Sequence, residues 1–172
     1  MEISLSPSGV QKAIDEIKKF KQDLQKKIDL LAERLATEGV KIAAVNFKNA
    51  QYDGINDVSV TFEKREEGHC AVVATGSAVL FIEFGSGVHY GTPTHPEAAE
   101  NEMNRGEYGK GYGKQDVWWY YGEPGTNGLV RRTTEKGDLV STRGNPANMS
   151  MYITVKELED KFSTIAKEVF SK

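Results

Sequence analysis

The chain has 172 residues and a formal net charge of −3, with 38% hydrophobic and 27% charged residues. These values favour one folded domain over a disordered chain, and they disfavour specific nucleic acid and membranes as partners. The single cysteine, Cys70, excludes an internal disulfide framework and fits folding in a reducing cytoplasm. No apolar run approaches the roughly 20 residues that span a bilayer, and we expect no signal peptide at the N-terminus.

The first third of the chain predicts one long amphipathic helix from about Ser8 to about Asn46, opened by Ser6 and Pro7. Such a helix would be on the order of 55 Å long, which exceeds the reach of a compact domain of this size. We therefore expect either a break near Gly39 or a projecting N-terminal half that binds another subunit. A hairpin with the C-terminal helix is the alternative. The candidate interface residues on the projecting stripe are Ile14, Ile17, Phe20 and Leu24.

Beyond a turn at residues 52–54, the apolar period changes from 3.6 to two. Residues 58–63 and 70–75 are predicted to be the strands of a hairpin, with the turn at residues 66–68. The apolar run at residues 79–84 follows a turn at residues 76–77 and is predicted to be a third strand. The short connections indicate an antiparallel sheet.

A Gly- and Tyr-rich segment at about residues 85–116 predicts a flexible loop that becomes ordered in an assembly. A strand at residues 118–121 follows, in which alternate aromatic side chains face opposite sides, so that one pair packs inward and the other is presented outward. We favour a protein interface here, with core packing or carbohydrate binding as alternatives. The candidate interface residues of this region are Tyr108, Tyr112, Trp118, Trp119, Tyr120 and Tyr121.

The C-terminal segment predicts a second amphipathic helix, with Asn148 or Ser150 as its N-terminal cap. Its apolar residues recur at steps of three and four from Met151 to Val169. We expect this helix to pack on the sheet, which would bury its central apolar residues. Those residues are Leu158, Phe162 and Ile165.

The sequence predicts no catalytic site, cofactor or metal centre. It contains no phosphate-binding loop, and the glycines near residue 85 do not have the spacing of a dinucleotide fingerprint. His69, His89, His95 and Cys70 lack the short pair spacings of zinc ligands. A metal-dependent hydrolase using His89 and His95 is a weaker alternative.

Four runs of sequence, in this order, resemble the tail-completion or head–tail joining proteins of long-tailed bacteriophages and prophages of Gram-positive bacteria. They are FKNAQYDG at residues 47–54 after the long helix, VLFIEFGSG at 79–87, WWY at 118–120, and TRGNPANM at 142–149 before the last helix. The resemblance extends over nearly the whole chain, and no single motif carries it alone.

The resemblance implies a virion protein, assembled in the host cytoplasm, that forms a ring of roughly six copies, or twelve on the capsid side. Its partners would be its own copies and a connector, tail terminator or tail tube. We predict a single α+β domain over residues 1–172: an antiparallel sheet of about four or five strands, with the N-terminal and C-terminal helices on one face. The alternative function is a glycan- or cell-surface-binding module that uses Trp118–Tyr121.

Overall fold

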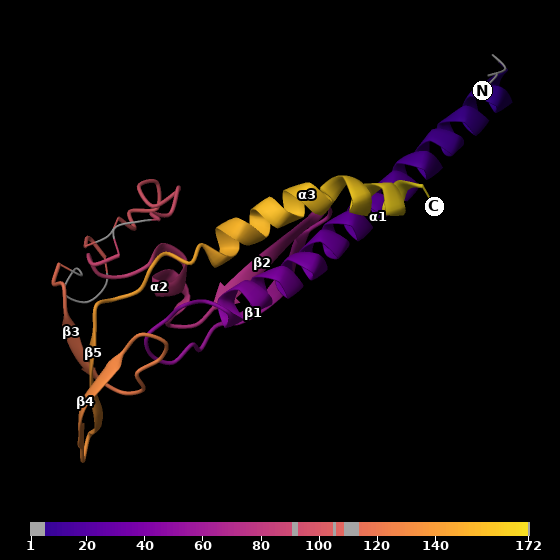
Figure 1. Cartoon of the computed structure of the whole chain (residues 1–172). Coiled ribbons are helices and arrows are strands. Elements are labelled where there is room, and N and C mark those ends of the chain that lie inside the picture. Colours follow the sequence, from indigo (N-terminus) through magenta and orange to yellow (C-terminus); the bar gives the residue numbers. More distant parts are fainter. Residues whose placement is uncertain (1–5, 91–92, 105, 109–113, 172) are drawn as a thin grey trace.

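The computed structural model describes residues 6–90, 93–104, 106–108 and 114–171. Figure 1 shows a long shaft formed by two helices and a β-hairpin, with a second sheet at the end opposite the N-terminus. The elements in chain order are α1 (Pro7–Lys48), β1 (Ser59–Glu66), β2 (His69–Thr75), α2 (Val79–Phe84), β3 (Trp118–Tyr121), β4 (Leu129–Thr134), β5 (Gly137–Thr142) and α3 (Ser150–Phe170).

Helix α1 runs unbroken for 42 residues. It begins where the sequence predicts, because the Ser6 hydroxyl accepts a hydrogen bond from the Gly9 amide at 3.2 Å. Gly39 does not break the helix, and its role is packing: a Cβ there would lie 2.8 Å from Val72 of β2 and 3.0 Å from Leu158 of α3. The glycine therefore lets the hairpin and the C-terminal helix approach the same turn of α1.

Strands β1 and β2 form the predicted antiparallel hairpin, with Val60 opposite Ala74 and Phe62 opposite Val72. Its inner face packs on α1, since Val72 is the side chain that meets Gly39. Lys64 near the end of β1 pairs with Glu33 of α1 at 2.6 Å. The two predicted strands and their turn are confirmed.

The prediction of a third strand at residues 79–84 is wrong, because this run forms helix α2. The Asp57 carboxylate accepts hydrogen bonds from the backbone amides of Ser77 at 2.8 Å and Ala78 at 3.0 Å. These amides belong to Ala78, the N-cap residue of α2, and to the residue before it, so the Asp57 carboxylate fixes the turn that leads into the helix. A short, mainly apolar run such as residues 79–84 cannot by itself distinguish a buried strand from a buried helix.

Strands β3, β4 and β5 form a second antiparallel sheet in the order β3-β5-β4. Trp119 of β3 and Leu129 of β4 lie on either side of Ser141 in the central strand. The expected strand at residues 118–121 is confirmed. The described residues form two sheets, of two and three strands, where we expected one continuous sheet.

Helix α3 packs antiparallel to α1. Near one end, the Asn46 side-chain amide donates to the Ser150 carbonyl at 3.3 Å, and near the other Arg34 pairs with Glu168 at 2.8 Å. The expectation that Phe162 is buried is wrong, because its side chain is 48% exposed. Helix α3 is turned so that Ser150, Thr154 and Val169 are buried, and part of its broad apolar arc faces outward.

The core lies at the C-terminal end of α1, where Ala43 and Phe47 pack with Ala78 and Ile82 of the α2 region. The α+β class is confirmed, including the long N-terminal helix and the C-terminal helix packed against it. Among the described residues, no helix has the length and apolarity needed to cross a membrane.

Candidate assembly surfaces

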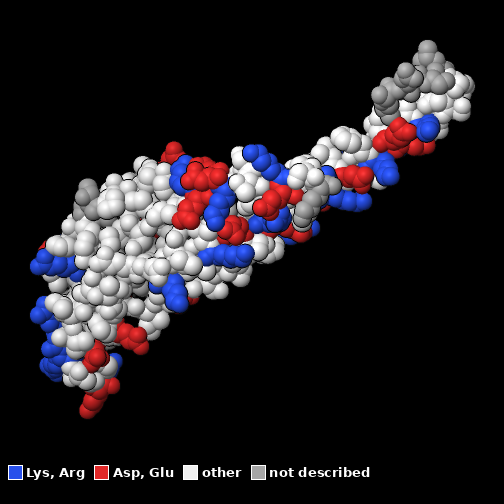
Figure 2. All heavy atoms as spheres, turned by 45° about the vertical axis from the view of Figure 1, so that its right-hand side comes forward, with Lys and Arg blue, Asp and Glu red and all other residues white. Residues whose placement is uncertain are grey.

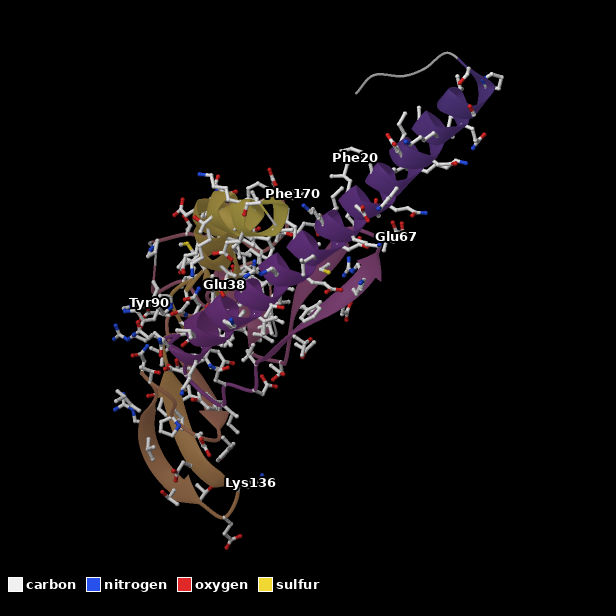
Figure 3. All side chains as sticks on the ribbon, turned by 90° about the vertical axis from the view of Figure 1, so that its right-hand side faces the viewer. Phe20, Glu38, Glu67, Tyr90, Lys136 and Phe170 are labelled. Atoms are coloured by element: carbon white, nitrogen blue, oxygen red, sulfur yellow. The ribbon has the colours of Figure 1, made fainter. Side chains whose placement is uncertain are left out.

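The N-terminal half of α1 projects beyond the rest of the molecule (Figure 1). The candidate residues on its stripe are exposed, most strongly Ile17 at 59% and Phe20 at 69%. Figure 3 shows Phe20 pointing away from α1, beyond the end of α3 that Phe170 marks. Ile14 and Leu24 are exposed on the same segment. The structure therefore shows the projecting N-terminal half, while the C-terminal half of α1 forms the antiparallel pair with α3 that we gave as the alternative.

The exposed stripe continues the stripe that is buried farther along α1. From Ala36 to Phe47 the apolar side of the helix lies under α3 and the hairpin. The tip of the hairpin reaches back to Ile28, whose side chain lies 3.0 Å from a Cβ built on Gly68. No described element covers the turns that precede this point. The first half of α1 thus presents a surface of the kind that its second half buries.

The aromatic side chains of β3 alternate between the two faces of the strand, as the sequence predicted. Trp118 and Tyr120 are half-buried on one face, while Trp119 and Tyr121 are more than half exposed on the other. The Trp118 indole donates to the Gln115 carbonyl at 2.9 Å, and the Tyr120 hydroxyl donates to the Glu123 carbonyl at 2.7 Å. The inward pair is fixed by hydrogen bonds, and the outward pair presents its rings to solvent.

A hollow of about 480 Å³ opens beside β3. Its walls combine the β3 aromatics with Tyr52, Phe81 and Tyr108, and Phe81 and Tyr108 stack with ring centroids 5.9 Å apart. Partial burial, together with the Asp53 carboxylate and Tyr52, raises the pKa of Tyr120 to about 12. The phenol is therefore neutral at pH 7, and the hollow suits an apolar or aromatic group. The candidate Tyr112 lies outside the described residues.

Asp53 lines this hollow and joins the segments around it by hydrogen bonds. Its carboxylate accepts hydrogen bonds from the Asn127 amide at 2.5 Å and from the Thr142 hydroxyl, while its own amide donates to Asn145 at 2.7 Å. A buried carboxylate needs such partners. The sequence showed Asp53 as a turn residue, and nothing in its local pattern indicated that it connects to two distant segments, at Asn127 and at residues 142–145.

Glu83 and His95 form a buried pair that the sequence did not predict. Their side chains are 8% and 2% exposed, and the His95 Nε2 lies 3.0 Å from the Glu83 carboxylate. The Glu97 amide donates to His95 Nδ1 at 3.1 Å, so Nε2 carries the hydrogen that Glu83 accepts. The same carboxylate also accepts from the amides of Met151 at 2.7 Å and Tyr152 at 2.9 Å.

Glu83 is therefore the N-terminal cap of α3, supplied from another helix. The prediction of Asn148 or Ser150 as the cap is wrong: Met149 occupies the cap position in a left-handed conformation, and no side chain there makes a capping bond. Asn148 instead accepts from the Gln51 amide at 2.8 Å. A charged residue inside the apolar run at residues 79–84 was the available signal for this role.

The three histidines lie in three separate places among the described residues. The His95 ring is buried and hydrogen-bonded to the Glu83 carboxylate. The His89 ring lies 3.2 Å from the Asp116 carboxylate at the surface. His69 is on the exposed hairpin beside Glu66. The described residues contain no group of three or more His, Cys, Asp or Glu arranged to hold a metal ion. The part of the chain that the structure describes thus gives no support to the hydrolase alternative based on His89 and His95.

The two candidate surfaces lie at opposite ends of the molecule (Figure 1). Figure 2 shows Lys, Arg, Asp and Glu interspersed along the shaft, whereas the broad end is mainly uncharged in this view, with charged residues of both signs at its margin. The exposed helix and the aromatic strand are therefore two separate patches. Comparison with known proteins adds no relative: no family model, curated protein or solved structure matches the chain.

Proposed function

We propose that this chain is a structural virion protein that forms a ring at the head–tail junction of a tailed bacteriophage or prophage particle, where it completes or closes the tail. The ring contains roughly six copies, and roughly twelve is the alternative on the capsid side. Its other partners are neck and tail proteins, such as a connector, a tail terminator or the tail tube. The sequence resemblance and the two exposed patches support this proposal.

The observation that carries the proposal is the uncovered stripe on the first half of α1. Ile17 and Phe20 are each more than half exposed, although the stripe follows the spacing of a buried helix face. Burying one such side chain completely contributes about 1.5–3 kcal/mol. Contiguous apolar patches of this kind usually mark interfaces, so a partner that covers the stripe gains several such contributions.

The positions of the two patches favour a ring over a symmetric dimer. The projecting helix and β3 lie at opposite ends of the chain (Figure 1). A contact between unlike patches of successive copies is head-to-tail, and such contacts close into a ring when the rotation between copies permits. This geometry agrees with the ring that the resemblance implies.

The double substitution Ile17→Glu with Leu24→Glu tests the proposal. Both side chains are exposed in the free chain, so circular dichroism and thermal melting should match those of the wild type. Ring formation, measured by native mass spectrometry, and joining of heads to tails, measured by electron microscopy of particles, should both be lost.

A matched control changes charge equally without touching the stripe. Lys12→Gln with Lys19→Gln lowers the net charge by the same amount on the same exposed segment and should leave ring formation intact. Loss of assembly in this control alone would attribute the effect to charge. Heads that still join tails in the Ile17→Glu, Leu24→Glu variant would contradict the proposal.

The aromatic hollow favours a second candidate function, a glycan- or cell-surface-binding module. Sugars stack on exposed aromatic rings, and β3 presents Trp119 and Tyr121 beside a hollow of about 480 Å³. A module of this kind would be monomeric and would change its Trp fluorescence on addition of cell-wall sugars. An unchanged spectrum with saturating sugar, together with a ring mass, would exclude it.

A further inference from the structure

The two small sheets leave four strand edges without a described partner. In the first sheet β1 and β2 each have one free edge, and in the second β3 and β4 flank the central strand β5. A free edge presents a row of unpaired N–H and C=O groups, which can pair with a strand of another chain. The residues on each edge indicate whether such pairing is prevented.

Strands β1 and β4 carry features that protect an edge. β1 ends in the charged run Glu63–Glu66, and its register shifts between Lys64 and Glu66. β4 carries Arg131 and Arg132 and has a register shift at the same place. Charged side chains and bulges are the usual means by which proteins prevent edge-to-edge pairing.

Strands β2 and β3 lack these features. β2 reads HCAVVAT and β3 reads WWYY, and neither contains Lys, Arg, Asp, Glu, Gly or Pro. The pairing of β3 with β5 has no register shift. Each sheet therefore has one protected edge and one edge that is open to pairing.

We propose that the free edge of β2 in one copy pairs with the free edge of β3 in the next copy. The inference rests on the proposed ring and names a contact within it. The joined strands form one five-stranded antiparallel or mixed sheet across each subunit boundary, and the backbone bonds supply the contact in the manner of strand addition.

Side-chain size makes these two edges complementary. Val72 faces α1, so its neighbours Ala71 and Val73 face the opposite side of β2. They are small side chains. β3 presents large aromatic ones, beside a hollow of about 480 Å³. Large residues on one strand and small residues on the other allow close packing across a strand pair.

Charge selects the same combination. Pairing the protected edges, β1 with β4, would bring the charged run Glu63–Glu66 and the arginines Arg131 and Arg132 into the contact, where these charged side chains would lose part of their hydration. Neither β2 nor β3 carries a charged carboxylate, guanidinium or ammonium group, so their pairing has no such cost. β2 lies on the shaft and β3 at the broad end (Figure 1), so this contact is head-to-tail.

The test introduces one lysine on each open edge, with a matched lysine on the protected edge of the same sheet. Val73→Lys is compared with Thr61→Lys, because these two residues are cross-strand partners on one face. Trp119→Lys is compared with Leu129→Lys, because both flank Ser141 and their exposed fractions are 58% and 56%. Circular dichroism checks that each full-length variant is folded.

Val73→Lys and Trp119→Lys should each lose the ring in native mass spectrometry, and both controls should keep it. A mixture of the two ring-deficient variants should form a heterodimer and nothing larger, since each copy retains the edge that the other lacks. Rings in all four variants, or loss in the controls alone, would overturn the edge pairing and leave the proposed ring in place.

Two further outcomes distinguish a failure of the β2–β3 contact from a failure of the proposed ring. If Trp119→Lys left a dimer that Val73→Lys abolished, β2 would pair with β2 and the head-to-tail contact would be wrong. If the wild type were monomeric both in solution and within particles, the proposed function would fail together with the inference.

Discussion

The two halves of α1 belong to one helix and continue one apolar stripe, yet they differ in what covers it. In the second half Ala43 is fully buried and Phe47 is 2% exposed, under α2, α3 and the hairpin. In the first half Phe20 is 69% exposed and no described element lies over it. Figure 3 shows this change along α1, where Phe20 lies beyond the end of α3.

The difference teaches how an amphipathic pattern should be interpreted. The spacing of apolar residues determines which face of a helix is buried, and it is the same in both halves. Whether the element that covers the stripe comes from the same chain depends on how far the other elements of that chain extend along the helix. α3 and the hairpin extend along α1 as far as Lys27 and Ile28, and the remaining stripe is available to another subunit.

The largest expected effect compares one substitution in the two halves. Phe47→Ala removes a buried ring and should lower the free energy of unfolding by about 3–5 kcal/mol. Phe20→Ala removes an exposed ring and should change it by about 0.5 kcal/mol or less in the free chain. Urea denaturation of both variants measures the two values. A similar large loss for Phe20→Ala would show that the first half of α1 is buried in the free chain.

Loss of the cap on α3 should have the next largest effect. Glu83→Ala leaves the amides of Met151 and Tyr152 and the ring of His95 without their acceptor, and this should cost about 2–4 kcal/mol. Hydrogen exchange should show faster exchange at those two amides. Glu100→Ala removes an exposed carboxylate from the segment that carries His95; it is the control and should be nearly neutral. An unchanged exchange rate would mean that Glu83 does not cap the helix.

The two sides of α3 provide a smaller contrast. Leu158 packs toward Gly39, so Leu158→Ala should cost about 2–3 kcal/mol. Phe162 is about half exposed, so Phe162→Ala should cost about 1 kcal/mol or less. Thermal melting of the two variants shows which substitution lowers the stability more. The reverse order would mean that α3 is rotated about its axis relative to the arrangement described above.

The smallest effect is a pH dependence at the start of α2. Hydrogen bonds from Ser77 and Ala78 lower the pKa of Asp57 below its ordinary value. A lowered folded-state pKa adds stability above the unfolded-state value near 4, and this stability is lost as the pH falls through the folded-state value. Asp57→Asn should therefore melt at a lower temperature than the wild type at pH 7, and the difference should narrow below about pH 4. A difference that stays constant from pH 7 to pH 3 would contradict this role.

Periodic segments with local start and stop signals could be predicted from the sequence. Ser6 and Pro7 mark the start of α1, the alternation near Val60 predicts the hairpin, and the run at Trp118 predicts a strand with two unlike faces. These signals act within a few residues, so the sequence displays them directly.

Features that depend on distant partners could not be predicted. The turn that leads into α2 is fixed by Asp57, some twenty residues earlier, and α3 is capped by Glu83 of another helix. Asp53 likewise connects loops that are far apart in sequence. The sequence also left open whether Gly39 ends α1, since its role depends on Val72 and Leu158 meeting there.

The mass of the assembled protein tests the central claim most directly, because copies of a 19.0 kDa chain that join through unlike patches form a closed ring when the rotation between copies permits, and this closed ring is what we propose. Native mass spectrometry of the purified wild type, and of the protein released from particles, should give a single multiple of the chain mass, with roughly six copies expected. The Ile17→Glu, Leu24→Glu variant should give the monomer mass. A wild type that is monomeric in both preparations would contradict the account.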